Sequence, residues 1–247
     1  MPEERGRSPK PGAGLFPATR PSAIFSIRSA DDGVRARSRD LIAAAYWRPI
    51  YKYLRLKWNR QAEEAEDLTQ AFFSKAFESD LFAVYDPSRA RFRTFVRLCV
   101  DRFVMKADEA DRALKRGGGA VVHGTVELGE AERKLADTSA DVEAAFDREW
   151  ARSVIAMSVD TLANELEARG KGKSFAVFER YELQAESAKT SYADVAASLG
   201  ISVTDVTNYL FVARRELRRI VLSALRELTA NDEEFREEAK ALLGIDV

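Results

Sequence analysis

The chain has 247 residues, of which 46% are hydrophobic and 32% are charged, and its formal net charge is −1. This composition supports a packed core in one or two domains. The single cysteine excludes an intramolecular disulfide, the single histidine excludes the usual zinc ligand sets, and no apolar run reaches the roughly 18 residues of a membrane span. We therefore expect a cytoplasmic protein that binds no metal, cofactor or membrane.

The N-terminal segment, residues 1–34, is rich in Pro, Gly, Ser and Arg, with only scattered apolar residues. Such a segment buries too little apolar surface to offset the entropy lost on ordering. We therefore predict a disordered basic arm over these residues.

Residues 35–106 show the three- and four-residue spacing of amphipathic helices. Apolar positions recur over residues 41–54, a second helix is expected over residues 62–78, and Asp86–Pro87 precede a third. Because aromatic residues fall on one face of each segment, we predict one compact helical domain here.

The pattern stops over residues 107–141, where three consecutive glycines favour a flexible linker. It resumes over residues 142–228, which we predict as a second helical domain. An acidic C-terminal tail, residues 229–247, follows. Nothing alternates with period two for long enough to predict a strand, so the fold class is all-α, with two helical domains joined by the linker.

Residues 191–219 read as a helix-turn-helix followed by an arginine-rich extension. Val195, Leu199, Ile201, Val206 and Tyr209 are expected to lock two short helices together, with a glycine at the turn. A serine and an aspartate three residues apart predict that the second helix begins near residue 203. An ordinary helical hairpin with solvated arginines is the alternative interpretation.

The outward face of that second helix is the candidate surface for double-stranded DNA. Polar and aromatic side chains near its start could meet base edges, and arginines further along could meet phosphates. The residues assigned to DNA are Thr204, Thr207, Asn208, Phe211, Arg214, Arg215 and Arg218.

A second candidate surface combines cations with aromatic rings after the Asp86–Pro87 turn. Phosphate neutralisation together with stacking is the combination that holds single-stranded DNA. The residues assigned to this surface are Arg89, Arg91, Phe92, Arg93 and Arg97, although the phenylalanines of this segment could equally belong to the core.

A third candidate surface is the acidic run at the start of the helix expected over residues 62–78. Its carboxylates cannot approach DNA phosphates favourably, so they favour a basic protein partner; a solvated helix N-terminus is the alternative. The residues assigned to protein binding are Glu64, Glu66, Asp67 and Gln70.

Three segments, taken in chain order, resemble the extracytoplasmic-function sigma factors of bacterial RNA polymerase. They are EAEDLTQAFF, DPSRARFRTFVRLCVDRF and YADVAASLGISVTDVTNYLFVARRELRR. The resemblance covers roughly residues 36–228. It implies that the acidic helix binds the clamp coiled coil of the polymerase's largest subunit. It further implies that the first domain opens the minus-ten element and the second reads the minus-thirty-five element.

This resemblance implies a promoter-specific initiation factor, not an enzyme, with core RNA polymerase and promoter DNA as partners. Regulation by a Ser/Thr kinase or by an anti-sigma factor is expected from the same likeness, with Thr69 as the candidate phosphorylation site. The competing interpretation is a stand-alone helix-turn-helix repressor or activator.

Overall fold

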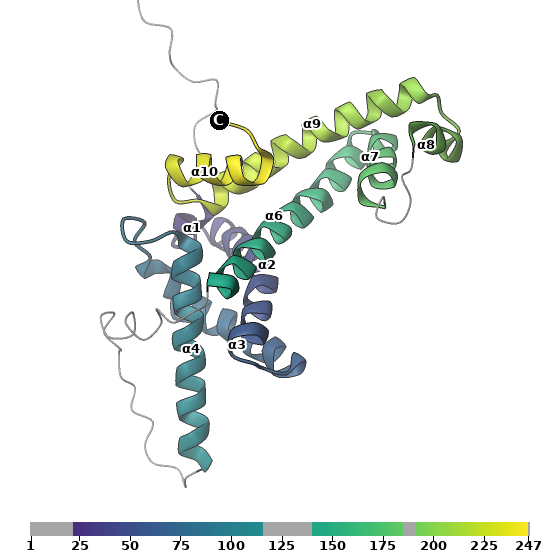
Figure 1. Ribbon diagram of the computed structural model, residues 1–247. Helices are drawn as coiled ribbons and strands as arrows, with labels where there is room; N and C mark the ends of the chain where they lie inside the picture. The colour runs from purple at the N-terminus through teal and green to yellow at the C-terminus, as the bar shows by residue number, and fades with distance from the viewer. Residues whose placement is uncertain (1–21, 116–139, 185–190, 247) are drawn as a thin grey trace, which may run out of the picture.

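The computed structural model describes residues 22–115, 140–184 and 191–246, and every element in those ranges is a helix or a helical turn (Figure 1). The first group comprises α1 (Ala23–Ser26), α2 (Asp32–Lys57), α3 (Ala62–Glu78), the short η1 (Leu81–Val84) and α4 (Phe92–Lys115). The second comprises α6 (Ala140–Ala168), α7 (Gly172–Phe178), the π-helical η2 (Glu179–Leu183), α8 (Tyr192–Leu199), α9 (Val203–Leu228) and α10 (Asp232–Leu243). The all-α prediction is confirmed for the described part of the chain.

Short polar side chains fix where several helices begin. The Asp31 carboxylate accepts a hydrogen bond from the backbone N–H of Val34 at the start of α2, and the Asn231 side chain accepts one from Glu234 at the start of α10. These contacts satisfy amide donors that have no partner within the first helical turn. The same device begins α8 and α9, as described below.

The buried side chains form two clusters that share the long helices α6 and α9. The larger one joins α1 to α4 with the first half of α6, the last turns of α9, and α10. The smaller one lies among α7, α8, the second half of α6 and the first half of α9. Two domains separated at residues 107–141 were expected, but here Trp150 of α6 and Leu225 of α9 belong to the same core as Tyr46 of α2. A helix of 26 or 29 residues is long enough to serve both clusters.

The N-terminal arm is shorter than predicted, because residues 22–34 contain α1 and the start of α2. Ile24 and Ile27 are buried, and the Ser22 hydroxyl donates a hydrogen bond to the carbonyl of Glu227 at 3.0 Å. The two isoleucines pack against apolar side chains of the larger core. The prediction missed this packing because it rested on the average composition of the whole segment. Residues 1–21 lie outside the described residues.

Two further boundaries differ from the prediction. Helix α4 continues to Lys115, so that the first nine residues of the expected linker are helical, and residues 116–139 lie outside the described residues. The predicted acidic tail contains α10, whose Phe235 and Ala239 are buried in the larger core. The apolar residues Phe235, Ala239, Leu242 and Leu243 share one face of this segment and pack against the larger core.

Helices α8 and α9 are joined by a three-residue turn and meet at 99°. Gly200 adopts a φ of +62°, a left-handed conformation that costs glycine little. Val195 and Val206 are buried as expected, whereas Leu199 is 37% exposed. Ile201 and Tyr209 pack against the same cluster while partly exposed, and Leu210, one helical turn after Val206 on the same face, is fully buried there.

Ser202 and Asp205 form a reciprocal capping box at the start of α9. The Ser202 hydroxyl accepts from the Asp205 N–H at 3.1 Å, and the Asp205 carboxylate accepts from the Ser202 N–H at 3.1 Å. The hydroxyl also donates to that carboxylate, and these bonds lower the pKa of Asp205. The predicted start of this helix at residue 203 is confirmed.

Replacing Ser202 with alanine is expected to lower the free energy of unfolding by about 1 kcal/mol, because the first turn of α9 loses its side-chain acceptor. Ser223→Ala, at an exposed position within the same helix, is the control and is expected to change it by less than about 0.5 kcal/mol. Urea denaturation followed by circular dichroism measures both. Equal losses in the two variants would contradict a capping role.

Candidate nucleic-acid interface

The acidic face of α3 is exposed, as its assignment to protein binding requires. The four residues assigned to this surface are all exposed: Glu64, Glu66, Asp67 and Gln70. The opposite face of α3 is buried and consists of Ala65, Thr69, Phe72, Phe73 and Ala76. Arg60 forms an ion pair with Glu64 at 2.6 Å, but the described structure gives Glu66 and Asp67 no ion pair. Two adjacent carboxylates in water can therefore receive cations from another molecule.

Thr69 is not accessible for phosphorylation in this structure, which corrects the sequence-based assignment. Its side chain is fully buried, and its hydroxyl donates to the carbonyl oxygen of Ala65 at 2.6 Å. Residues four apart share one face of a helix, so Thr69 follows Ala65 into the core whereas its neighbours Asp67 and Gln70 do not. A kinase could reach this hydroxyl only if α3 left its packing.

The outward face of α9 presents the side chains that were assigned to base edges. Thr204, Thr207, Asn208 and Phe211 are exposed, Phe211 by 65%. An exposed phenylalanine is unusual on a water-facing helix surface, and the guanidinium of Arg215 lies 6.0 Å from the centre of its ring. This face can offer hydrogen bonds and apolar contact to base edges.

The arginines that follow on α9 are exposed but mostly engaged in ion pairs within the chain. Arg214 pairs with Glu182 of η2, its Nε donating at 2.8 Å, and Arg215 pairs with Glu216 at 3.0 Å. Arg218 is exposed, and the described structure gives it no ion pair. Exposed pairs of this kind contribute about 0–1 kcal/mol, so these guanidinium groups can exchange a carboxylate for a phosphate.

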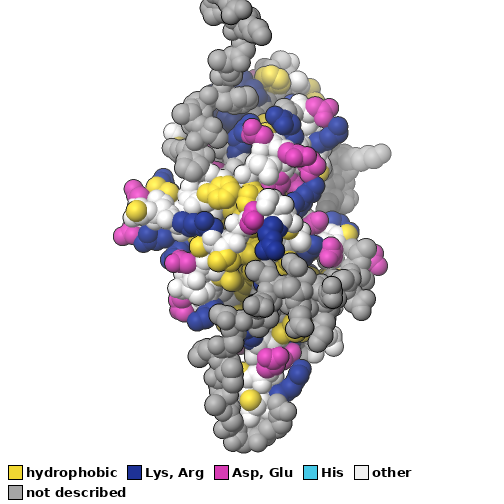
Figure 2. Space-filling model, turned by 90° about the vertical axis from the view of Figure 1, so that its left-hand side faces the viewer, with side chains coloured by type: hydrophobic (Ala, Val, Ile, Leu, Met, Phe, Trp, Pro, Cys, Tyr) yellow, Lys and Arg dark blue, Asp and Glu magenta, His cyan; other side chains and the backbone are white. Residues whose placement is uncertain are grey.

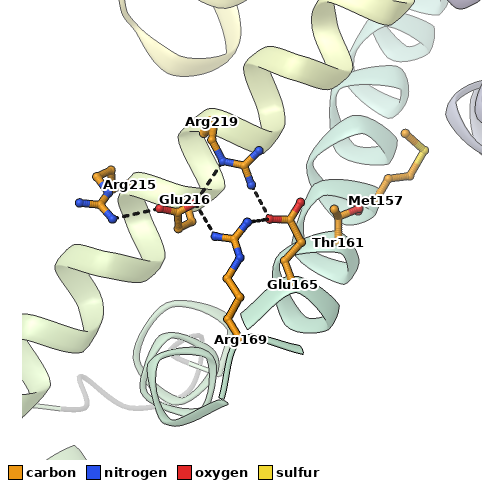
Figure 3. Close-up of polar contacts among 7 residues, drawn as sticks. All are labelled: Met157, Thr161, Glu165, Arg169, Arg215, Glu216 and Arg219. Carbon is orange, nitrogen blue, oxygen red and sulfur yellow. Dashed lines mark hydrogen bonds and ion pairs between the residues drawn. The ribbon is translucent and has the colours of Figure 1, made fainter. Parts of the chain in front are cut away.

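Glu216 sits at the centre of an arginine cluster between α6 and α9 (Figure 3). It accepts from Arg219 and Arg215, both at 3.0 Å, and from Arg169 at 3.3 Å; the hydrogen bonds from Arg219 and Arg215 lower its pKa to about 2. Glu165 of α6 pairs with Arg169 at 2.8 Å and also with Arg219. The sequence analysis did not single out these acids: Arg215 and Arg219 share α9 with Glu216, and only the Arg169–Glu216 and Arg219–Glu165 pairs join distant segments.

The loop before α4 presents only part of the predicted single-strand surface. Arg89 and Arg91 are exposed, but Phe92 is completely buried among Tyr46, Tyr85 and Phe82, with ring centres 5.0–5.7 Å apart. Phe92 therefore cannot stack on a base in this structure, and its assignment to DNA is wrong for this state. Because neighbouring residues of a helix point in different directions, Phe92 faces the aromatic core although Arg91, directly before it, is exposed.

Arg93 and Arg97 are also covered, each being 8% exposed. The guanidinium of Arg93 lies 4.3 Å from the centre of the Trp150 ring and donates to Glu238 of α10. Arg97 pairs with Glu143 of α6 at 2.9 Å. Their assignment to accessible DNA-binding positions is thus corrected: α6 and α10 occupy this side of α4. The surplus of acids near the C-terminus was the only signal in the sequence for this contact.

Cations and acids alternate across the molecular surface instead of forming one large basic region. Figure 2 shows one face on which Lys and Arg side chains are interspersed with Asp and Glu around apolar ones. Because salt screens charge over roughly 10 Å, separate local clusters decide which ligand each part of the surface attracts.

The described residues give little support to a metal site, a membrane-spanning helix or a reactive cysteine. No group of three metal-ligating side chains occurs within them. No single described helix has the length and apolar content to cross a membrane, although α8 and α9 together meet that test across their bend. Burial raises the pKa of the Cys99 thiol to about 12, which makes it a poor nucleophile.

Two hollows are present in the described part. One, of about 400 Å³, lies among α2, α6 and α9 and is lined by both charged and apolar side chains, including Asp40, Met157 and Arg219. The other, of about 570 Å³, is mainly apolar and lies between α6 and the end of α10. Neither gathers a set of residues with recognisable chemistry. Comparison of the chain with protein-family models, curated proteins and solved structures gave no match.

Proposed function

We propose that this chain is a sigma-type initiation factor that binds core RNA polymerase and directs it to a class of promoters. In this proposal the acidic face of α3 contacts the basic clamp coiled coil of the largest subunit. The surface around α4 takes opened promoter DNA, and α8 with α9 act as a helix-turn-helix on the upstream duplex. The protein acts by binding, in the cytoplasm, and catalyses no reaction.

One observation carries this proposal: a single chain presents an acidic face on which Glu66 and Asp67 have no ion pair in the described structure and, on another element, an exposed face suited to the major groove. Glu66 and Asp67 are exposed on α3, and Asn208 with Phe211 are exposed near the start of α9. A protein that only bound duplex DNA would have no need of an acidic docking face. The pairing of the two surfaces favours a factor that brings DNA and a basic protein together.

Glu66→Lys/Asp67→Lys is expected to weaken association with core RNA polymerase at least about tenfold, because both carboxylates would be replaced by charges that repel a basic partner. Glu109→Lys/Asp111→Lys, which makes the same charge change at exposed positions of α4, is the matched control. Biolayer interferometry with immobilised core enzyme measures the dissociation constant, and circular dichroism checks the fold. Unchanged association of the α3 variant would refute the proposal.

A stand-alone transcriptional regulator is the second candidate, and the capped α8–α9 pair with its exposed face favours it equally. The two functions differ in what they require for DNA binding. A regulator binds its operator duplex without polymerase, whereas an initiation factor is expected to bind promoter duplex well only in the presence of core enzyme. Selection of bound duplexes from a random library, with and without core enzyme, separates them.

A further inference from the structure

Helix α10 lies against the beginning of α4, where it covers Arg93 and pairs with the exposed Arg91 just before the helix. Its chain leaves the end of α9 and folds back against the body of the molecule (Figure 1). Along α10 the acids fall on two sides: Glu237 at the exposed edge and Glu234 with Glu238 on the buried face. The Glu238 carboxylate is turned toward the basic segment, whereas that of Glu234 accepts a hydrogen bond from the backbone N–H of Ala230 at 2.8 Å.

The contact between α10 and α4 is ionic and has two parts. Arg93 donates from Nη2 and Nη1 to the two carboxylate oxygens of Glu238, at 2.6 and 3.2 Å, and both side chains are at least nine-tenths buried. At the edge, Arg91 pairs with Glu237 and lies 3.6 Å from Glu238. Two carboxylates on a helix thus hold two guanidinium groups much as two phosphates would.

The contact between α10 and Arg93 buries charged and polar groups, and their desolvation is unfavourable in free energy. Burial, together with the nearby carboxylates of Glu234 and Asp147, raises the pKa of Glu238 against the attraction of Arg93 and Arg91. The hydroxyl of Tyr46 and the indole N–H of Trp150, beside the same arginine, have no hydrogen-bond partner in the described structure. A buried ion pair is often no more stabilising than apolar side chains of the same volume.

The apolar attachment of α10 is correspondingly small. Phe235 and Ala239 are its two buried apolar side chains, and Leu242 and Leu243 pack against the same core while partly exposed. The guanidinium of Arg226 lies 4.0 Å from the Phe235 ring centre. By contrast, α6 contributes Phe146, Trp150 and Val154 to the same core. Helix α10 thus contributes fewer fully buried apolar side chains to this core than α6 does.

We infer that α10 is displaceable, that it covers Arg93 and pairs with the half-exposed Arg91, and that single-stranded DNA competes with Glu237 and Glu238 for the phosphate-binding surface that these two arginines form. The inference rests on the proposed function, in which this side of α4 takes opened promoter DNA. When α10 leaves, the Trp150 ring still supports the Arg93 guanidinium, so the cation is held in position for a phosphate.

The test uses the full chain and a fluorescein-labelled oligothymidylate of about 20 nucleotides, long enough for several phosphate contacts. Glu237→Gln/Glu238→Gln is expected to tighten binding about tenfold, a coupling of ordinary size between competing contacts. Glu233→Gln/Asp246→Asn, which removes the same charge from the same segment, is expected to change binding less than about twofold. Adding Arg91→Ala/Arg93→Ala to the first variant is expected to abolish the gain. Fluorescence anisotropy measures all four proteins at one salt concentration.

Equal tightening in the two neutralised variants would overturn the inference, because it would show a general charge effect. So would an unchanged affinity in Glu237→Gln/Glu238→Gln, or a gain that survives loss of the two arginines.

Core polymerase association measured on the same proteins separates the two proposals. If polymerase binds every variant and the DNA affinities do not differ, the cover is refuted and the proposed function stands. If the cover behaves as expected but no variant binds polymerase, the proposed function fails alone.

Discussion

Asp101→Ala is expected to lower the free energy of unfolding by about 3–5 kcal/mol, because it removes a buried acceptor that ties α4 to the end of α2. Asp101 is 2% exposed, and its carboxylate accepts from the Tyr53 hydroxyl at 3.0 Å, the Lys57 ammonium at 2.8 Å and the Trp58 indole N–H at 2.9 Å. Burial, together with the neighbouring carboxylate of Asp101, raises the pKa of Tyr53, so the phenol stays a donor throughout the physiological range. Guanidinium denaturation measures the loss.

The control for this prediction is Asp232→Ala. Asp232 pairs with Arg226 at 3.3 Å in an exposed position, where an ion pair contributes no more than about 1 kcal/mol. A loss at Asp101 as small as the loss at Asp232 would mean that α4 is held by its apolar face alone. That result would contradict a structural role for the buried carboxylate.

Trp150→Ala is also expected to cost about 3–5 kcal/mol, because it leaves a cavity where α6 packs against the first group of helices. The indole is 1% exposed, its ring centre lies 6.4 Å from that of Tyr46, and it supports the Arg93 guanidinium. Trp47→Ala is the control: this ring is 37% exposed and stacks on Phe73, so its removal opens no enclosed cavity. Thermal and denaturant unfolding compare the two variants.

This second prediction also tests how the core is divided. If residues before and after the linker formed independent cores, loss of Trp150 would leave the stability of α2 and α3 unchanged. Because Trp150 and Tyr46 belong to one cluster, we expect hydrogen exchange in α2 to accelerate in Trp150→Ala. Unaltered protection in α2 would contradict a shared core.

Local features of the chain were readable from the sequence because they depend on near neighbours. The three- and four-residue spacing gave the helical class, and Ser202 with Asp205 gave the start of α9. The same periodicity placed Thr204, Asn208 and Phe211 on the outer face of that helix, where they are exposed. Each of these features depends on residues within about two helical turns of one another, and the tertiary contacts leave them unchanged.

The exposure of Phe92, Arg93 and Thr69 could not be predicted in the same way. Basic and aromatic residues interleave identically in a DNA-binding groove and in a segment that packs against acids, and only the partner distinguishes the two. For Arg93 that partner is Glu238, 145 residues later in the chain. For Thr69, the backbone carbonyl of Ala65 takes the hydroxyl hydrogen bond inside the core.

The amino-acid order by itself thus determined which segments are helical, where α9 begins, and which side chains its outer face presents. Tertiary packing alone decided that α6, α9 and α10 join the first group of helices, and that α10 covers Arg93 of α4. The physical reason is that helix formation and capping are local hydrogen-bond and spacing effects. The burial of a charged side chain, in contrast, depends on whether a distant segment brings an opposite charge to the same place.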